Sequence, residues 1–201
     1  KCLFFKEESA DQFIHSERLH VFLEELFLES GKSKSEIQAV AVGKGPGSYT
    51  GLRIGVSSAK GLCYALGIPL LAEDSLKILA NQAIQSLSLD EDDLIIPVLD
   101  ARRMEVYCQV YTSKMQECKA TESFSDLKAS KIHFVGDALE KIEKTSKDPR
   151  FVFHHTIKFP NALSLGELSE EKFAQQNFED IAYFEPWYFK DFIAGKPKKL
   201  V

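Results

Sequence analysis

The chain has 201 residues, of which 44% are hydrophobic and 27% are charged, with a formal net charge of −5. This is the composition of a soluble globular protein with one large or two small domains, and it excludes an intrinsically disordered chain. The acidic balance argues against an independent, strongly basic nucleic-acid binder, because phosphate affinity needs clustered Lys and Arg. No apolar run approaches the roughly 18 residues of a membrane span. The four cysteines have no C-x-x-C spacing, so we expect a reducing, cytoplasmic location without membrane contact.

The first quarter of the chain predicts a strand, a helix and a second strand. Residues 2–8 are strand-like, and residues 9–12 are polar and predict a loop. From Ser16, apolar residues recur at helical spacing as far as Gly31, which is suited to end the helix. The run "SKSEI" predicts a short helical turn, and residues 37–43 predict a strand rich in β-branched residues. Because the sequence begins with Lys1 directly in a strand-like run, we expect it to lack a native N-terminal segment.

The rest of the chain continues this alternation. Residues 49–67 predict a helix that Gly67 and Pro69 end, residues 68–74 a strand, and residues 75–89 a helix with Ser75 as its N-cap. Residues 92–113 predict a hairpin that turns at residues 100–103. Residues 132–146 predict a strand, a glycine turn and a helix, residues 160–178 a helix, and residues 182–192 an extended segment. The polar stretch 112–130 could be a linker, and the whole pattern predicts an α/β fold with a mixed sheet.

The run "GKGPGSYTGLRIG" at residues 43–55 raises the question of whether it holds a phosphate or lets two backbones approach. Its spacing matches neither the Walker loop nor the dinucleotide fingerprint. A glycine turn between a strand and a helix does direct N–H groups and the helix dipole at one point, which makes Gly45, Gly47 and Ser48 a candidate phosphate loop. The dipole alone contributes roughly 0.3–1 kcal/mol, too little to identify a nucleotide site.

Small residues recur at four-residue spacing in the helix after this loop, at Gly51, Gly55 and Ala59. Each interior glycine costs about 1 kcal/mol of helix stability relative to alanine, so such a run is expected to permit close approach to another backbone. One interpretation is packing against the chain's own sheet. The other is contact with a helix of another protein, with Phe22 and Phe27 of the preceding helix providing a matching ridge. The residues alone leave both open.

No catalytic constellation emerges from the residues. His15 and His20 are five apart and do not form the i, i+4 pair of a metal site. His154 and His155 would point to opposite faces of a strand. Ser48 lies in no nucleophile elbow and is expected to be a helix N-cap. Asp100 is expected to stabilise its turn through an ion pair with Arg102 or Arg103, and Trp187 to fill the core or a junction between lobes. We therefore expect no catalytic residue, no metal and no cofactor.

The segment "AVGKGPGSYTGLRIGVSSAKGL" resembles the signature of the TsaB (YeaZ) family, the non-catalytic relatives of the threonylcarbamoyltransferase TsaD. Further segments agree in order along nearly the whole chain: "HSERLHVFLEEL", "VLDARRMEVYCQVY", "FVGDALEK" and "FEPWYFKDF". The resemblance implies a tandem ribonuclease-H-like fold of the actin/Hsp70/sugar-kinase type with a degenerate second lobe. Here the sequence starts after the first strand of that fold, with its Asp-Thr or Asp-Ser motif. The implied lobes are residues 1–100, truncated at the start, and a smaller lobe of residues 101–201.

The resemblance also implies the function of a scaffold without catalysis of its own, in forming threonylcarbamoyladenosine in tRNA. Its partners would be a TsaD-like catalytic subunit, a TsaE-like ATPase, tRNA through the complex alone, and a second copy of itself when no partner is present. The partner-binding residues would come from the two helices discussed above: Arg18, Phe22, Gly51, Gly55, Ser58 and Ala59. On this basis we expect Gly55→Leu to abolish partner binding while leaving the fold largely intact.

Two other classes of function stay open. One is an active enzyme of the same fold, either a glycoprotease-like metallopeptidase, which the missing metal pair disfavours, or a small-molecule kinase. The other is an RNA-binding module, which the acidic balance disfavours.

Overall fold

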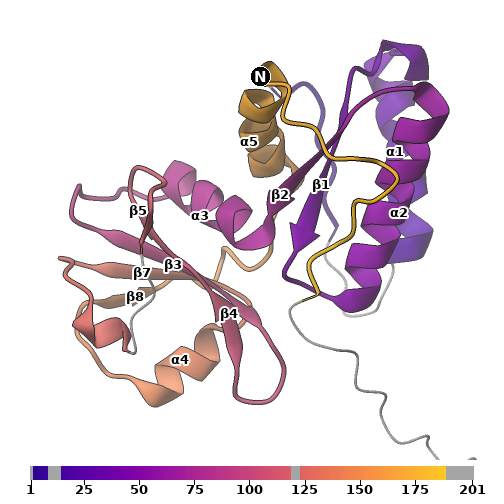
Figure 1. Ribbon diagram of the computed structural model, residues 1–201. Coiled ribbons are helices and arrows are strands. Elements are labelled where there is room, and N and C mark those ends of the chain that lie inside the picture. Colours follow the sequence, from indigo (N-terminus) through magenta and orange to yellow (C-terminus); the bar gives the residue numbers. More distant parts are fainter. Residues whose placement is uncertain (1, 9–14, 119–122, 189–201) are drawn as a thin grey trace, which may run out of the picture.

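The computed structural model describes residues 2–8, 15–118 and 123–188, and its strands form two sheets (Figure 1). In the first, β1 (Val40–Gly45) pairs in parallel with β2 (Leu70–Asp74). The second is six-stranded, with order β6-β5-β3-β7-β8 and β4 also paired with β3. Its strands are β3 (Leu94–Asp100), β4 (Val106–Cys108), β5 (Val110–Thr112), β6 (Glu117–Cys118), β7 (Ile132–Gly136) and β8 (Phe151–Phe153). Parallel and antiparallel pairs occur together, so the expected mixed α/β architecture is confirmed.

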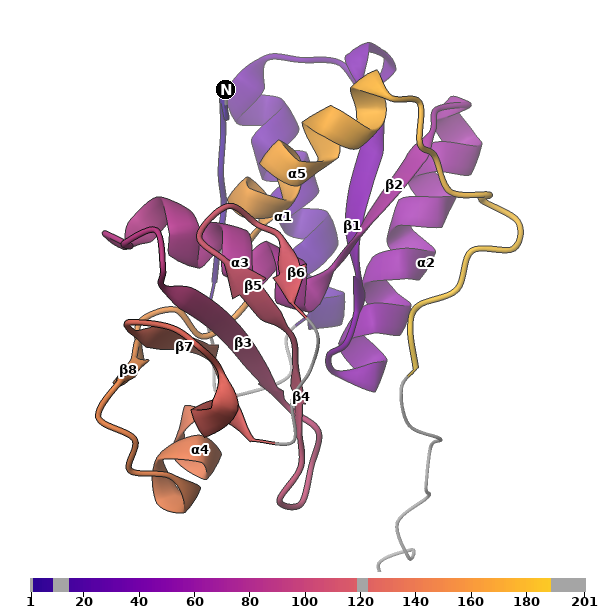
Figure 2. The ribbon, with the colours of Figure 1, turned by 60° about the vertical axis from the view of Figure 1, so that its left-hand side comes forward.

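Helices cover both sides of the small sheet and lie between the two sheets. Helix α2 (Tyr49–Leu66) packs on one side of β1 and β2, and α5 (Ala162–Ala174) packs on the other, as Figures 1 and 2 both show. Helix α1 (His15–Ser30) contacts α2. Helix α3 (Ser75–Ser86) contacts both sheets and α5 and therefore joins the two halves, while α4 (Leu139–Thr145) packs on β7. None of the helices among the described residues has the length and apolar character needed to cross a membrane.

Local capping explains where the central helices begin and end. The Ser48 hydroxyl accepts a hydrogen bond from the Gly51 N–H at 3.3 Å and so caps α2, as predicted, and Gly67 ends this helix with a φ of 66°. The predicted cap of α3 is wrong. The Asp74 carboxylate accepts the Leu76 N–H at 2.7 Å, and Ser75 is the first helical residue and is buried. A carboxylate is the stronger acceptor for the positive end of the helix dipole.

The strand predicted for residues 2–8 is also wrong, because this segment has no regular secondary structure. No described strand pairs with it, and an isolated strand leaves its backbone hydrogen-bonding groups unpaired. Side-chain contacts place it beside α1 instead. The Lys6 ammonium lies 2.6 Å from the Glu25 carboxylate and 2.7 Å from that of Glu29. The predicted loop at residues 9–12 lies outside the described residues.

The predicted linker at residues 112–130 belongs to the six-stranded sheet in its described parts. Strand β6 pairs with β5, and a 3₁₀ turn at Phe124–Asp126 places the Phe124 ring 5.3 Å from the Phe134 ring of β7. The hairpin of β3 is confirmed, with its returning strand divided into β4 and β5. Strand β8 was not predicted. Its three residues, Phe-Val-Phe, are types that favour strands, but the run is too short to show an alternating pattern.

Candidate partner-binding surface

The glycine loop packs against the backbone of a later part of the same chain, at Trp187. Gly45 is buried with a φ of 108°, and a Cβ atom at this position would lie 3.0 Å from the Trp187 carbonyl oxygen. The Trp187 N–H donates a 2.7 Å hydrogen bond to the Lys44 carbonyl oxygen. Gly47 is exposed, and the Ser48 hydroxyl serves the helix cap. These contacts support close backbone approach as the reason for Gly45, while phosphate binding by Gly45, Gly47 and Ser48 stays a prediction.

The backbone that approaches the loop is residues 179–188, which we call the C-terminal strap. It crosses the small sheet and follows α2 (Figure 1). The Glu179 N–H bonds the Leu70 carbonyl oxygen at 2.9 Å, and the Lys60 ammonium donates to the Phe184 carbonyl oxygen at 2.9 Å. Trp187 was expected in the core or at a lobe junction, and this was wrong. Its side chain is 48% exposed, with the Lys44 ammonium 4.4 Å from its ring centre, because its backbone rather than its ring fills the space beside the loop.

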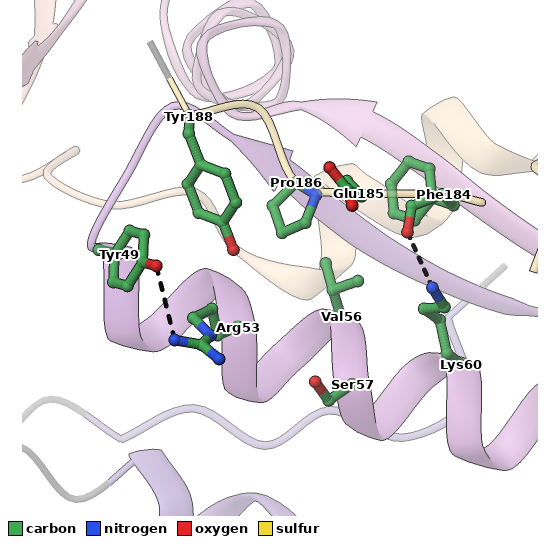
Figure 3. A pocket seen from close by; sticks show the side chains of 9 residues that line it. All are labelled: Tyr49, Arg53, Val56, Ser57, Lys60, Phe184, Glu185, Pro186 and Tyr188. Carbon is green, nitrogen blue, oxygen red and sulfur yellow. Dashed lines mark hydrogen bonds between the residues drawn. The ribbon is translucent and has the colours of Figure 1, made fainter. Parts of the chain in front are cut away.

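A groove of about 300 Å³ separates α2 from the strap (Figure 3). The Tyr49 and Tyr188 rings lie at one end, with their centres 4.8 Å apart. Burial raises the pKa of Tyr188, and the proximity of Tyr49 adds to this. The groove is lined by Tyr49, Arg53, Val56, Ser57, Lys60, Phe184, Glu185, Pro186 and Tyr188. The sequence analysis did not identify it, although Arg53, Ser57 and Lys60 recur at helical spacing and indicate a polar stripe.

The small residues of α2 face the chain's own sheet. Ala59 is 4% exposed and belongs to a cluster with Cys63 and Leu70. A Cβ on Gly55 would lie 3.7 Å from the Val42 Cγ2 atom of β1. Of the two interpretations that the sequence left open, these contacts support packing against the chain's own sheet. The expectation that Gly55→Leu leaves the fold largely intact stays a prediction, and the neighbouring Val42 side chain argues against it, since the longer side chain would extend toward β1.

Helix α1 meets α2 on a neighbouring flank, where the His20 Nε2 and Ser58 Oγ atoms are 3.4 Å apart. On α1, the Arg18 guanidinium lies 4.7 Å from the Phe22 ring centre and donates to the Glu8 carboxylate at 2.8 Å. Gly51 lies next to the Ser48 cap. The structure therefore places the predicted partner-binding residues on two touching helices, with Gly55 and Ala59 on the inner side. Their role in binding stays a prediction.

The outer side of α1 carries exposed apolar side chains among acidic ones, because Glu24 and Glu25 lie between Val21 and Leu28 on the same stripe. None of the side chains of residues 18–30 is buried, although the run is rich in leucine and phenylalanine. Val21 is 37% exposed and Leu28 is 82% exposed, and because they are seven residues apart they lie on one stripe of α1. Tyr64 of α2 is 84% exposed. Tyr64 shares the stripe of Ser57 and Lys60 beside the strap, so it does not extend the exposed surface of α1. Exposed apolar side chains on a surface helix are a feature of protein-binding faces.

A hydrogen-bonded row of three side chains, buried except for the half-buried His154, links the residue before β3 to β7 and to the residue after β8. The Asp93 Oδ2 atom is 3.2 Å from His133 Nε2, and His133 Nδ1 is 2.9 Å from His154 Nε2. Burial would raise the pKa of Asp93, but hydrogen bonds from the Asp90 N–H and from His133 outweigh it and lower that pKa. Burial lowers the pKa of His154, and the His133 charge adds to this. The sequence analysis missed these hydrogen bonds, because the three residues that form them are far apart along the sequence. His155 points elsewhere and pairs with Glu143 at 2.8 Å.

Asp100 stabilises its turn, but its ion pair is not the predicted one. Its carboxylate accepts the Arg102 backbone N–H and lies 2.9 Å from the Lys141 ammonium of α4. Burial would raise the pKa of Asp100, but the Lys141 hydrogen bond and the Arg102 N–H outweigh it and lower that pKa. Within the described ranges, no group of three or more His, Cys, Asp and Glu side chains is arranged to hold a metal ion.

Comparison with known proteins identifies the class. A family model described as TsaD, tRNA N6-adenosine threonylcarbamoyltransferase, matches residues 10–194, which puts the chain among TsaD-related proteins. Two relatives are named tRNA threonylcarbamoyladenosine biosynthesis protein TsaB. The one from Haemophilus influenzae is 25% identical over 92% of this chain and 84% of its own length, and the one from Escherichia coli is 25% identical over 90% and 83%.

The solved structure of YeaZ from Pseudomonas aeruginosa is similar in fold, with a TM-score of 0.75. It is 26% identical and aligns with 88% of this chain and 84% of its own. Taken with the TsaB relatives, this likeness agrees with the resemblance carried by residues 41–62. The chain belongs to the TsaB (YeaZ) family.

Proposed function

We propose that this chain is a non-catalytic scaffold subunit in the biosynthesis of threonylcarbamoyladenosine in tRNA, and that it binds a TsaD-type threonylcarbamoyltransferase. The names of its relatives and the TsaD family match support this role. The proposal includes the tandem ribonuclease-H-like architecture, with lobes at residues 1–100 and 101–201. The two sheets support two lobes, but the elements cross the boundary at residue 100: β3 belongs to the six-stranded sheet, and α5 and the C-terminal strap return to the first sheet.

The observation that carries the proposal is the exposure of Val21 and Leu28 on one stripe of α1, beside Glu24 and Glu25. Burying a valine or leucine side chain is worth about 1.5–3 kcal/mol, so leaving Val21 and Leu28 in water forgoes a stabilisation that a docked partner would supply. Helix α1 contacts α2, so a partner docked on α1 would lie close to that helix as well. We infer that the partner contributes helices of its own, since ridges and grooves on two helices pack efficiently against two others.

The residues predicted from the sequence have two roles in this proposal. Arg18, Phe22, Gly51 and Ser58 contribute to the contact region of the helix pair. Gly55 and Ala59 act indirectly, because they set how closely α2 lies on β1 and therefore where its outer face stands. Without the partner, the same apolar face pairs with a second copy of the chain. A TsaE-like ATPase joins the assembled complex, and tRNA binds only through it.

The test is to replace Val21 and Leu28 together by glutamate and to measure co-purification with a TsaD-type subunit and tRNA modification by the reconstituted system. Two charges in a buried apolar interface should weaken binding by roughly 100-fold or more, the loss expected from two side-chain burials. Circular dichroism and the unfolding midpoint should stay unchanged, since both side chains are exposed in the single chain. The variant should also be monomeric where the wild type dimerises.

The matched control is Leu163→Glu with Tyr183→Glu, on α5 and the strap. These side chains are 37% and 84% exposed, close to the 37% and 82% of the test pair. This control should bind and support modification normally. Wild-type binding by the Val21/Leu28 variant would refute the proposed face, and threonylcarbamoyl transfer by the pure chain alone would refute the non-catalytic role.

A further inference from the structure

The hairpin that joins β3 to β4 ends in an unusual tip, which we define as residues 101–105. It projects beyond the sheet at the lower edge of the molecule in Figures 1 and 2. Arg102 has a φ of 66° and Arg103 a φ of 53°, so two successive arginines occupy the left-handed region. Such a pair of positions favours Asn and Gly, and each other residue type costs of order 1–2 kcal/mol there. A conformation with this cost is expected where the side chains it presents have a function.

The backbone of the tip is held by contacts at its base that use neither arginine side chain, although the Arg102 charge lies near Asp100 and helps to lower the pKa of that carboxyl. The Asp100 carboxylate, the nearest acidic group of β3, accepts the Arg102 backbone N–H and pairs with Lys141. The Lys141 ammonium also donates to the Glu105 carbonyl oxygen at 3.0 Å, and the Glu105 N–H bonds the Arg102 carbonyl oxygen at 3.2 Å. Across residues 2–8, 15–118 and 123–188, neither guanidinium forms an ion pair or a side-chain hydrogen bond.

The charge of the tip differs from that of the whole chain. Residues 102–105 are all exposed, and they carry two adjacent arginines and the Glu105 carboxylate, so the tip has a formal charge of +1 in a protein with a net charge of −5. Guanidinium groups bind phosphate oxygens through two parallel hydrogen bonds. A ribbon tip offers little area, whereas a stable protein–protein interface needs about 800 Å² from each partner. Contacts to separate phosphates need no such area, so the shape favours a nucleic-acid backbone over an acidic protein.

We propose that Arg102 and Arg103 bind phosphates of the tRNA backbone when the chain is part of the modification complex. This inference rests on the proposed function and adds a substrate contact to the scaffold. The contact positions the RNA and carries no base specificity. The tip lies at the end of β3, apart from the α1 stripe, so a catalytic subunit docked on α1 leaves it accessible (Figure 2).

The test is the double variant Arg102→Asn/Arg103→Gly, assembled with the catalytic subunit and titrated with unmodified tRNA at several salt concentrations. Asn and Gly suit the left-handed positions, so the turn is kept and the melting temperature should be equal or higher. Removing two phosphate contacts should reduce the slope of log affinity against log salt by about 1–2. The KM for tRNA at low salt should rise by about tenfold, with kcat unchanged, because the contact is made equally before and during catalysis.

The matched control is Lys128→Ala/Lys131→Ala. Both lysines are exposed, and they precede β7 at the opposite end of the six-stranded sheet from the tip, so the same two charges are lost at a distance. The control should retain the wild-type salt slope and KM. An unchanged slope and KM in the Arg102/Arg103 variant would overturn the inference while the scaffold function stands. Loss of binding to the catalytic subunit instead would identify an acidic protein surface as the ligand and also overturn it. Failure of the wild-type chain to form the complex would overturn both.

Discussion

At the scale of single residues, close backbone approach decides several glycine positions. The clearest is Gly136 at the end of β7. Its φ is 122°, and a Cβ atom there would lie 1.9 Å from the Val98 carbonyl oxygen of β3, a distance at which no side chain fits. Gly61 on α2 is the opposite case, because a Cβ atom there would meet no atom within 4 Å.

We predict that Gly136→Ala destabilises the protein by at least about 3 kcal/mol, because β3 and β7 must move apart to admit the methyl group. Gly61→Ala should stabilise it by about 1 kcal/mol through helix propensity. Urea unfolding of both variants measures the difference. Equal unfolding midpoints would contradict the close contact between β3 and β7.

Residue-scale features were predictable from the sequence where they are local. The Ser48 cap and the helix end at Gly67 depend on residues within one turn, and the sequence identified both. The chain of Asp93, His133 and His154 was not predictable, since it forms only when β3 and β7 pair and the residue after β8 comes beside them. The partner of Asp100 was missed for the same reason, because Lys141 comes from a helix of a later segment.

At the scale of elements, long helices with a clear apolar period were predicted nearly to the residue, as α1 and α2 show. Strands were less predictable from the sequence, because a strand is stable only when a neighbouring strand forms hydrogen bonds with it. Residues 2–8 have strand-like residues but no described strand pairs with them, whereas β8 has a weak pattern and joins β7. The small-residue spacing in α2 predicted close approach of another backbone, but a Cβ atom on Gly55 would meet only the Val42 side chain, at 3.7 Å.

Helix α5 is attached to the small sheet by an ion pair with one buried carboxylate. The Glu73 carboxylate at the end of β2 is 3% exposed as a residue and lies 3.3 Å from the Lys172 ammonium of α5. The same ammonium donates to the Ala72 carbonyl oxygen at 2.5 Å, and Lys77 lies 3.5 Å from Glu73 as a second partner. The pair therefore ties α5 to the small sheet.

We predict that Lys172→Met destabilises the protein by about 2 kcal/mol, less than for a buried charge left entirely unpaired, because Lys77 stays close to Glu73. The methionine keeps the aliphatic packing. Adding Glu73→Gln should restore part of the loss, since the carboxylate no longer needs a cation. Chemical denaturation of the single and double variants measures this coupling. A double variant that loses the sum of both single effects would contradict it.

At the scale of the whole molecule, the hydrogen-bonded residues Asp93, His133 and His154 make the free energy of unfolding depend on pH. The folded pKa of His154 lies below its ordinary value of 6.5. The unfolded chain therefore binds more protons just below this pH, and the free energy of unfolding falls as the pH decreases from about 6.5 through the folded pKa. Asp93 has a lowered pKa and stays charged over this range, so it contributes to the loss of stability only in stronger acid.

We predict that the wild type loses stability between pH 7 and about pH 5 and that His154→Asn removes most of this dependence. The asparagine amide can still donate a hydrogen bond to His133 but does not titrate. The neighbouring His155→Asn is the control and should behave as the wild type, because His155 points away and pairs with Glu143. Urea unfolding across this pH range is the measurement. A pH dependence unaffected by His154→Asn would assign the effect to other groups.

The return of the C-terminal strap to the small sheet has a consequence for the order in which the protein is completed during synthesis. Residues 40–74 leave the ribosome early, yet the N–H of Trp187 that meets Lys44, and the carbonyl of Phe184 that meets Lys60, are made more than a hundred residues later. The six-stranded sheet has all its strands once Phe153 is made. The part of the polypeptide that is translated first is therefore the last to receive its full set of contacts.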